Sequence, residues 1–377
     1  MTLIKINPRS TIESMKSTNK NLLLNGDFSV CQRTEHKPGT VETGVVAASN
    51  GVRIDRWSVG GNATTSNIEC DVLYHETTLA GGFATTGFRN AQLIDVTTGN
   101  ATLDAGNYVF TQQRIETKNV ANRLYYGRPI AKSITLSFWV RSTVTGKYGV
   151  SLINRKDAAS SYRRRNIMSY TVNVSNTWEK KSVTFVGDTD SNFGLDLTNS
   201  TQNPYFAVAW HWVAGTNRVA SASSEYTSEG VWYTDTLLNG IEFVAPDGQV
   251  NGFSSASNNI YLTGCQLEIG TVATDFEHRT FQSQIEDCHR YLFVSNHGNT
   301  KTDSQGGQYY TNMYTTSAGQ VMHQFPTVMS KIPTVTYTIA GGGVVDGNRT
   351  RTDGLYLYDS TDASWRIYNW RADAELG

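Results

Sequence analysis

The sequence lacks an excess of charge of either sign, and it lacks long apolar runs. Its 32 Lys and Arg residues balance 33 Asp and Glu residues, which leaves a formal net charge of −1. This balance argues against nucleic acid or an anionic membrane as a partner, because both require a clustered positive field. No run of about eighteen apolar residues occurs, so we expect no membrane insertion. Residues 1–19 have no apolar core segment, since Lys5 interrupts the only candidate, and a signal peptide is not expected.

Cysteine is scarce, with 4 residues in the whole chain. The cysteines lie far apart and form no CxxC pair, which excludes a zinc knuckle or a dense disulfide framework. Free cysteine is among the most buried residue types. We therefore expect four buried thiols, in a protein made in a reducing compartment, at Cys31, Cys70, Cys265 and Cys288.

Runs of Lys, Glu and Ala are also missing, whereas aromatic, β-branched and small polar residues are abundant. Aromatic residues make up 11% of the chain and charged residues only 17%, a composition opposite to that of disordered proteins. A length of 377 residues is comfortable for two domains, each with its own core. The composition predicts a folded, all-β protein.

Short segments with β-strand patterns follow one another from residue 21, with turn residues between them. The segment Ile134–Arg141 (ITLSFWVR) alternates Ile134, Leu136, Phe138 and Val140 with Thr135, Ser137 and Trp139, so these two sets lie on opposite faces. Without helical segments between the strands, the pattern predicts antiparallel sheets in a large sandwich over residues 21–279. Residues 1–20 are predicted to form an N-terminal arm or docking segment. The expected strands include Leu22–Leu24, Ile54–Val59, Ala91–Thr97, Tyr108–Arg114, Ile134–Arg141, Tyr148–Ile153, Met168–Val174, Trp178–Val186, Tyr205–Val213, Gly240–Val244 and Asn259–Glu268.

One segment has helical spacing instead. Phe281, Ile285, Cys288 and Leu292 lie on one stripe of a helix, and Thr280 is a suitable N-cap. We expect a linking helix over residues 280–293. Residues 294–377 then form a second, smaller β-sandwich module, with strands at Gly319–Val328, Thr334–Ile339, Leu355–Asp359 and Trp365–Trp370.

Aromatic residues next to polar ones are candidates for sugar binding, because sugar rings stack on aromatic rings while their hydroxyls pair with polar side chains. Two such stretches predict a glycan site, and packing in the core is the alternative for both. In the second module, alternation at Trp365, Tyr368 and Trp370 favours core or a subunit contact. The candidate glycan residues are Trp210, Trp212, Tyr226, Trp232, Tyr233, Asn217 and Arg218.

Catalytic signatures are absent from the sequence: it contains no GxSxG, HExxH, P-loop or GxGxxG motif. His211, between two tryptophans, has no partner pattern for a nucleophile–base relay. We predict that the protein is not an enzyme. Arg163–Arg165, the only basic run, is predicted to be a solvated hairpin that contacts an acidic neighbour, and binding of a phosphate-rich glycan or nucleic acid is the alternative. Carboxylate pairs that could act in glycan hydrolysis are Asp188/Asp190, Glu225/Glu229 and Asp235/Glu242, all in contexts typical of turns.

Several strings have a familiar order: NLLLNGDFSVCQR at Asn21–Arg33, LDAGNYVF at Leu103–Phe110, TWEKKSVTF at Thr177–Phe185 and YLTGCQLEIGTVATDFEHRTF at Tyr261–Phe281. Together they resemble the pattern of tail-fibre and other appendage proteins of tailed bacteriophages, which carry a jelly roll like that of carbohydrate-binding modules. The resemblance implies a virion protein, made in the host cytoplasm, that binds a host-surface glycan and assembles as a homotrimer. It also implies contact with other virion proteins, for which residues 1–20 are the candidate segment. A capsid decoration or head-fibre protein is the alternative, and a glycan depolymerase is a weaker one.

The resemblance also implies a structural calcium ion near the first and last strands of the jelly roll. Asp27 and Glu268 are the matching carboxylates, although Ser29 stands where the family has a further acid. Calcium requires six or more oxygen ligands. A hydrogen-bonded pair of surface carboxylates is therefore the alternative, and no other cofactor is expected.

Overall fold

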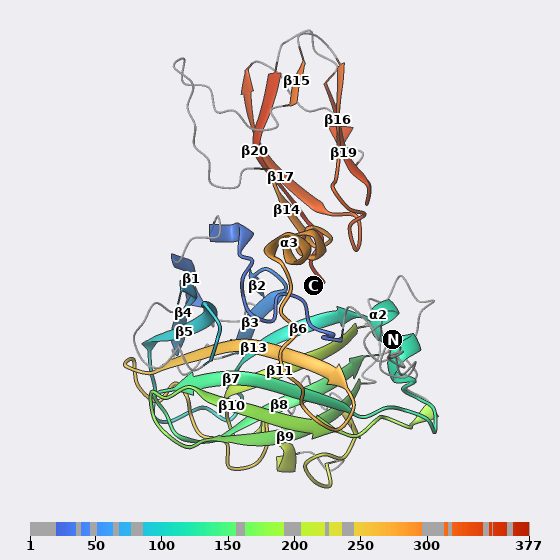
Figure 1. Ribbon diagram of the computed structural model, residues 1–377. Coiled ribbons are helices and arrows are strands. Elements are labelled where there is room, and N and C mark those ends of the chain that lie inside the picture. Colours follow the sequence, from blue (N-terminus) through green and yellow to red (C-terminus); the bar gives the residue numbers. More distant parts are fainter. Residues whose placement is uncertain are drawn as a thin grey trace, which may run out of the picture.

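A computed structural model describes residues 20–34, 39–45, 51–62, 68–76, 86–155, 163–191, 205–222, 226–235, 245–295, 313–315, 319–341, 347–348, 350–359 and 365–376. These residues form a large β-sandwich and a smaller β module, with helix α3 (Phe281–His289) lying between the two (Figure 1). The predicted all-β class and the antiparallel sheets are confirmed. The predicted arm lies outside the described residues except for Lys20, as does the predicted strand Gly240–Val244.

Within the described ranges, six strands form the first sheet of the sandwich. All neighbours in this sheet pair antiparallel. Its order is β1 (Gly39–Val45), β4 (Glu69–Glu76), β5 (Asn90–Thr98), β13 (Asn259–Ile269), β7 (Ile134–Ser142) and β10 (Glu179–Phe185).

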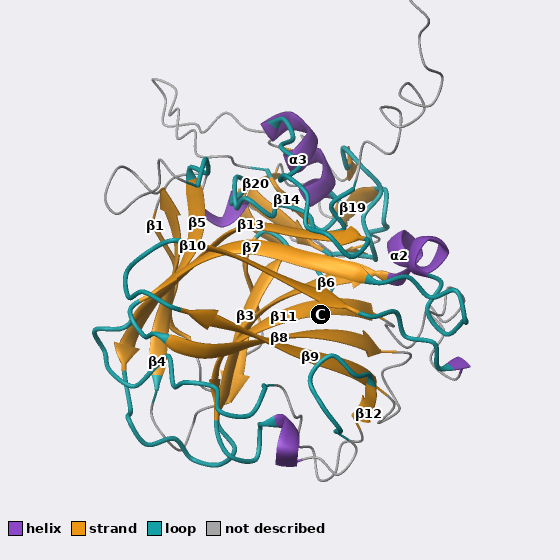
Figure 2. Ribbon diagram, turned by 60° about the horizontal axis from the view of Figure 1, so that its bottom comes forward, coloured by secondary structure: helices purple, strands orange, loops and turns teal. Residues whose placement is uncertain are grey.

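Seven described strands form the second sheet, which lies against the first (Figure 2). The chain crosses repeatedly between the two sheets, as in a jelly roll. The order here is β12 (Tyr233–Asp235), β9 (Arg163–Val172), β8 (Gly146–Arg155), β11 (Tyr205–Ala214), β6 (Tyr108–Glu116), β3 (Trp57–Asn62) and β2 (Gly51–Ile54).

The core of the sandwich fills the space between the sheets. Ile134, Leu136, Phe138 and Val140 are all fully buried there, which confirms the face predicted from alternation in β7. Burying each such side chain contributes about 1.5–3 kcal/mol relative to leaving it in water. The periodicity of two therefore specifies the register, since a slip of one residue would move this set to the outer face of the sheet.

Three sequence predictions for the sandwich are wrong in detail. Residues 22–24 form no strand, and the chain bends from residue 23, although Leu22 and Leu23 are buried. The predicted strand Ile54–Val59 is divided between two strands: Ile54 ends β2 and Trp57 begins β3, with a turn at residues 55–56, where Arg56 adopts a left-handed backbone conformation with a φ of 72°. A helix, α2 (Thr117–Leu124), also interrupts the strands, with Val120 and Leu124 buried on one side.

Helix α3 begins where the sequence predicts it. The Thr280 hydroxyl accepts a hydrogen bond from the Ser283 backbone N–H at 3.3 Å, as an N-cap does. Ile285 and Cys288 pack against Val30 of the sandwich. Phe281, in contrast, is exposed, so the apolar stripe covers less than the predicted length. The helix also ends at His289, because the chain enters the next strand at Leu292.

The second module is also built from two antiparallel sheets in its described part, as predicted. Its core contains Leu355 and Leu357 from one sheet and Trp370 and Ala372 from the other. Trp370 is therefore core, whereas the side chains of Trp365 and Tyr368 lie outside the described set. One sheet contains β14 (Leu292–Val294), β20 (Trp365–Asp373), β15 (Met313–Thr315) and β17 (Thr334–Gly341); the other contains β16 (Gly319–Gln324), β19 (Gly354–Asp359) and β18 (Gly347–Asn348).

Buried charges join the two modules. The Arg56 guanidinium forms an ion pair with Glu375 and lies 3.5 Å from the ring centroid of Tyr291. Arg290 contacts Glu116 at 2.7 Å, and the Tyr291 hydroxyl donates to the same carboxylate at 2.7 Å. Burial alone would raise the pKa of Glu116, but the bonds from Arg290 and Tyr291 hold it below its ordinary value. The C-terminal strand and its tail are thus tied to the sandwich by partnered charges.

No helix in the described part of the chain is long and apolar enough to cross a membrane.

Candidate functional site

The predicted glycan residues Trp210 and Trp212 lie in the core. Both indoles point between the sheets, with the Trp210 ring 5.6 Å from Trp57 and 5.5 Å from Phe138. Trp212 Nε1 donates to Thr111 Oγ1 at 2.9 Å. The alternative reading, packing, is therefore correct for this strand, because residues 210 and 212 share the inward face of β11.

The second predicted stretch is also mostly packed. Trp232 is buried, and its Nε1 donates to the Val186 carbonyl at 2.7 Å. Tyr233 is buried beside Tyr226, and Arg218 lies over the Tyr108 ring at 4.6 Å. Of the seven predicted glycan residues, Tyr226 is partly exposed and Asn217 is exposed. The sequence-predicted site is thus not assembled as a surface.

The described carboxylates among the catalytic candidates have structural partners. Asp188 is fully buried and pairs with Arg164 at 3.0 Å, which also lies 3.7 Å from Asp190. Glu229 accepts from Ser169 Oγ at 2.6 Å and contacts Lys147 at 3.2 Å. Of the remaining candidates, Glu225 and Glu242 lie outside the described residues, as does the side chain of Asp235.

The basic run contacts an acidic neighbour, as predicted, but it is not solvated. Arg164 holds Asp188, and Arg165 is buried and donates to Ser151 Oγ at 3.2 Å. The same hydroxyl lies 2.8 Å from His211 Nε2. Ser151 and His211 resemble a nucleophile and base in distance only, because both are buried, and burial holds the pKa of His211 well below its ordinary value. Ser151, Arg165 and His211 thus form a buried polar cluster on the face of the seven-stranded sheet that points away from the core.

Asp27 and Glu268 are engaged by separate neighbours. Glu268 is buried and accepts hydrogen bonds from Thr274 and Gln266 at 2.7–2.9 Å. Asp27 accepts from Gln284 at 3.2 Å. Glu268 is therefore not a surface carboxylate, and no cluster of three or more potential metal-ligating side chains occurs in the described ranges.

The four cysteines are free and buried, as predicted. Burial raises the pKa of Cys31 to about 12, so its thiol stays protonated and unreactive at neutral pH.

A different set of aromatic residues lies on the outer side of the six-stranded sheet. Tyr261 of β13 pairs with Arg141 of β7, and Trp139 lies two residues before Arg141 on the same face. On the other side of Tyr261, Leu93 of β5 pairs with it. β4 pairs with β5 in turn, which places His75 of β4 on the same face. Trp139, Tyr261 and His75 are partly exposed, unlike the buried inner residues of the same strands. We call Trp139, Tyr261, His75, Arg141 and the adjoining Trp178 the aromatic face.

The rings of the aromatic face hold one another in place. The Tyr261 centroid lies 5.5 Å from His75 and 5.9 Å from Trp178, both in edge-on contacts. Trp178 is buried, so its contact anchors the more exposed Tyr261 ring. The Arg141 guanidinium lies 5.0 Å from the Tyr261 centroid, within cation–π range. Tyr261 is therefore oriented by three neighbours before any ligand arrives.

A glycine in β13 permits this arrangement. Gly264 lies in a bulge of the β13–β7 pairing with a φ of 59°, and a Cβ there would meet the Phe88 ring at 2.5 Å and Trp139 at 3.1 Å. Phe88 and Trp139 pack directly over this glycine.

Charge on the aromatic face is mixed. Arg141 Nε is buried and has no hydrogen-bond partner in the described part of the chain. Burial and the nearby Arg141 both lower the pKa of His75, so His75 is neutral at pH 7. Burial and Asp71 raise the pKa of Asp95, which lies opposite Asn259 at the edge of this face. The face thus offers flat rings beside a cation, a carboxylate and an amide.

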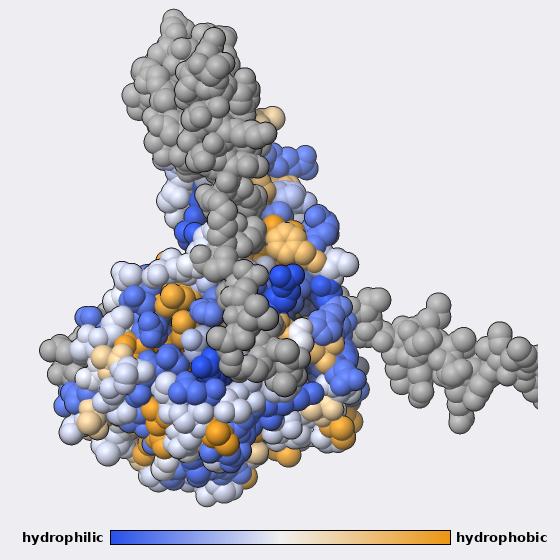
Figure 3. Space-filling view, turned by 60° about the vertical axis from the view of Figure 1, so that its left-hand side comes forward, coloured by the Kyte–Doolittle hydropathy of each residue, from blue (hydrophilic) through white to orange (hydrophobic). Residues whose placement is uncertain are grey.

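This face is not predicted from the sequence, although a signal for it is present there. Trp139 is on the polar side of the alternation in ITLSFWVR, where an indole has no core to fill. Tyr261 lies 122 residues later, and only the pairing of β13 with β7 brings the two together. Figure 3 shows that apolar residues on the side drawn there occur in small separate groups among polar ones.

Comparisons with known proteins give weak likenesses. No protein-family model matches the chain, and no curated protein matches it. Among solved structures, the chain is similar to the enzymatically active domain of tailspike protein 4 of bacteriophage CBA120, with 11% identity and a TM-score of 0.31 over 67% of this chain and 22% of that one. A structure of CBM4 gives 12% identity and a TM-score of 0.32, over 65% of this chain and 98% of that one. A family 11 carbohydrate-binding module of a Clostridium thermocellum cellulase gives 10% and 0.27, over 60% and 98%. The architecture described above rests on the pairing of this chain's own strands.

Proposed function

We propose that this chain is a glycan-binding structural subunit of a bacteriophage virion, in a tail fibre or similar appendage, and that the aromatic face holds the host-surface glycan. The observation that carries the proposal is the partly exposed Tyr261 ring, which is held between His75, the buried Trp178 and the Arg141 guanidinium. Rings with two rotatable bonds provide contact area at a small entropic cost.

A shallow site of this kind binds one sugar chain weakly. Joining several copies raises the overall affinity by about 10²–10⁴ when the geometry allows simultaneous binding. A homotrimer, implied by the resemblance to phage appendages, would supply this gain. Attachment to other virion proteins through residues 1–20 belongs to the same proposal.

The proposed role is adhesion without catalysis. Support comes from the described carboxylate candidates, since Asp188 and Glu229 are neutralised by Arg164 and Lys147. Hydrolysis of a glycan requires two carboxyl groups that flank an open bond. A groove with such a pair is absent from the aromatic face in the residues described.

The test is retention of the recombinant protein on host cells and on a glycan array. Tyr261→Ala and Trp139→Ala are expected to reduce retention at least about tenfold, because each removes one stacking surface. Tyr356→Ala, at a partly exposed tyrosine of the second module, is the matched control and should leave retention unchanged.

Two outcomes would contradict the proposal. No retention of the multivalent wild-type protein would favour a capsid decoration or head-fibre role. Release of reducing sugar from host polysaccharide would instead identify a depolymerase.

A further inference from the structure

Arg141 of the aromatic face is a cation that no carboxylate neutralises in the described part of the chain. Its Nε is buried and unpartnered, and its contacts are the Tyr261 ring and a long interaction, at 3.5 Å, from Nη2 to Asn176 Oδ1. A guanidinium carries five N–H donors. Most of the donors of Arg141 are therefore left without a protein acceptor in this part of the chain.

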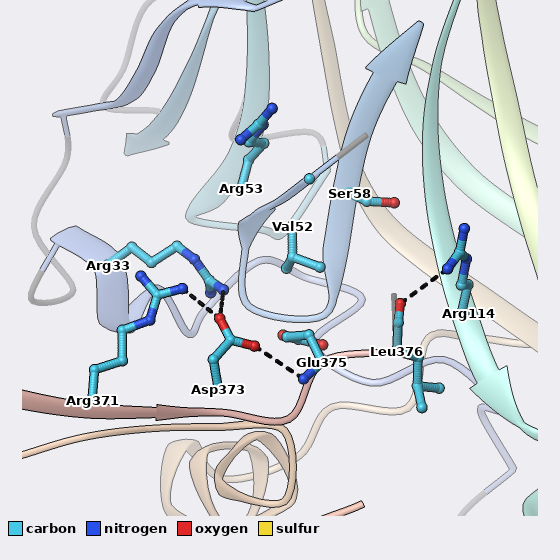
Figure 4. A pocket seen from close by; sticks show the side chains of 10 residues that line it. Arg33, Val52, Arg53, Ser58, Arg114, Arg371, Asp373, Glu375 and Leu376 are labelled. Atoms are coloured by element: carbon cyan, nitrogen blue, oxygen red, sulfur yellow. Dashed lines mark hydrogen bonds and ion pairs between the residues drawn. The ribbon is translucent and has the colours of Figure 1, made fainter. Parts of the chain in front are cut away.

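The arginines at the junction between the sandwich and the second module are different. A hollow of about 360 Å³ lies there, and Arg33 and Arg371 extend from its walls toward Asp373 (Figure 4). Arg33 also contacts the buried Asp55 at 2.9 Å. The protein itself neutralises these two cations, whereas Arg141 keeps its charge.

Cross-strand pairing places Arg141 at the end of an apolar row. Tyr261 of β13 lies between Arg141 of β7 and Leu93 of β5, and Leu73 of β4 follows beside Leu93. Residues directly opposite each other share a face, and neighbouring strands lie about 4.8 Å apart, so the row is roughly 14 Å long. Leu93 is buried and Leu73 is partly exposed. The row is an apolar track with a cation at one end.

A second cation lies on the same side of the face. Lys180 of β10 pairs in register with Trp139, two residues before Arg141 on β7. Its side chain is exposed, and it forms no ion pair with any described residue. The positive charge of Arg141 is thus reinforced rather than cancelled by this neighbour.

Carboxylates occur on the opposite side of the same face. Asp71 of β4 pairs in register with Asp95 of β5, and β13 separates both strands from β7. Asp71 contributes to the raised pKa of Asp95, so each acid has a like charge nearby. The aromatic face is therefore polarised, with cations on β7 and β10 and carboxylates on β4 and β5.

We propose that the aromatic face binds an acidic saccharide, with the carboxylate of the sugar on Arg141 and its ring on the apolar row. The planar guanidinium matches a carboxylate in two parallel hydrogen bonds. At the other end, the hydroxyls of the sugar can donate to Asp95. The polarity of the face thus sets the direction of the ligand across the strands. That the ligand is a saccharide rests on the proposed function, whereas the preference for a carboxylate rests on Arg141.

The first test is titration of the full chain with the methyl glycosides of glucuronate and N-acetylneuraminate, followed by ligand-observed NMR. Their methyl esters have the same rings without the charge, and acetate has the carboxylate without a ring. At least one acidic sugar should bind about tenfold more tightly than its ester and than acetate, because only the acidic sugar makes both contacts. Added salt should weaken that binding.

Other outcomes of the titration would overturn the proposal. Equal binding of both acidic sugars and their esters would remove the role of the charge, and equal binding of acetate would remove that of the ring. Inorganic phosphate that binds as tightly as the acidic sugars would indicate a general anion site. Absence of binding for every probe would also contradict the inference.

Variants locate the binding. Arg141→Gln should weaken acidic-sugar binding at least about tenfold and leave binding of the ester unchanged. Arg351→Gln is the matched control, because Arg351 also lies over a tyrosine ring, that of Tyr356, at 5.8 Å. Lys180→Glu alters an exposed side chain and should weaken acidic-sugar binding roughly threefold.

The two variants at the positive end decide the location together. Unchanged binding in Arg141→Gln and Lys180→Glu, with melting temperatures as in the wild type, would exclude this end of the face. If Arg141→Gln lowers the melting temperature, the result for Lys180→Glu decides by itself.

Retention on host cells separates this inference from the proposed function. Retention that is lost in Tyr261→Ala but unchanged in Arg141→Gln would sustain the aromatic face as the glycan site and overturn the preference for a carboxylate. No retention of the wild type, with acidic-sugar binding that is lost in Arg141→Gln, would overturn the adhesion function and sustain the inference.

Discussion

Trp210 and Trp139 are the same residue type in two neighbouring layers of one sandwich, and their surroundings differ completely. Trp210 is fully buried between Trp57 and Phe138, whereas Trp139 lies partly exposed on the outer side of the six-stranded sheet. An indole between two sheets contributes to stability, and an indole on an outer face is available to a ligand. Residue type alone therefore does not distinguish a core residue from a binding residue.

The largest expected effect is the loss of stability when the buried Trp210 is replaced. Trp210→Ala removes a side chain with no exposed surface, and the surrounding rings cannot fill the space. We expect a loss of about 3–5 kcal/mol in the free energy of unfolding. Urea unfolding measures this directly, and a loss below about 1 kcal/mol would mean that the core collapses around the cavity.

The second effect concerns an ionisable group in the interior. Burial raises the pKa of Asp55 from 3.8 to about 6, despite the opposing charge of Arg33 and the backbone N–H of Gln32. The folded state therefore takes up a proton between these values, so this contribution to stability is complete below pH 3.8 and is lost as pH rises through 6. When the pH is lowered from 7 to 4, the free energy of unfolding of the wild type should rise by up to about 3 kcal/mol relative to that of Asp55→Asn.

Unfolding of both proteins across this pH range tests the expectation. The Asn variant removes the background from other titrating groups, such as Glu116, whose pKa is shifted downward. A difference that does not change with pH would show that Arg33 keeps Asp55 ionised in the folded protein.

The third effect concerns Gly264, over which Trp139 of the aromatic face packs. Gly264→Ala places a Cβ against Phe88 and Trp139 at a φ of 59°, and we expect a loss of about 1–3 kcal/mol together with weaker glycan retention. Gly248→Ala is the matched control, because its φ is 73° but nothing lies within 4 Å. Equal losses in the two variants would attribute the cost to backbone conformation alone.

The smallest effect on stability is expected at the outer layer. Trp139→Ala should change the free energy of unfolding by less than about 1 kcal/mol, while retention on glycan falls. A loss comparable to that of Trp210→Ala would make Trp139 a structural residue and end the distinction between the layers.

Much of the fold could be predicted from the sequence because strands have a local signature. Alternation in β7 correctly identifies the buried set from Ile134 to Val140, and Thr280 correctly marks the start of α3. The turn at Arg56 and helix α2 were missed. Their patterns are short, and tertiary packing around them outweighs local preference.

The candidate sites were less predictable. Trp210 and Trp212 share one face by alternation, and the sequence does not say whether that face is inward or outward. The contact between Arg33 and Asp373 is a stronger case, since these residues are separated by more than three hundred positions. Only the packing of the second module against the sandwich brings them to the same cavity.

By itself, the sequence determined the β class, the register of the buried face and the position of the linking helix, because periodicity and capping act over a few residues. The tertiary structure alone decided which aromatic rings remain in contact with solvent and which arginines meet. Those properties depend on how strands from distant parts of the chain pair and on which surfaces the modules cover.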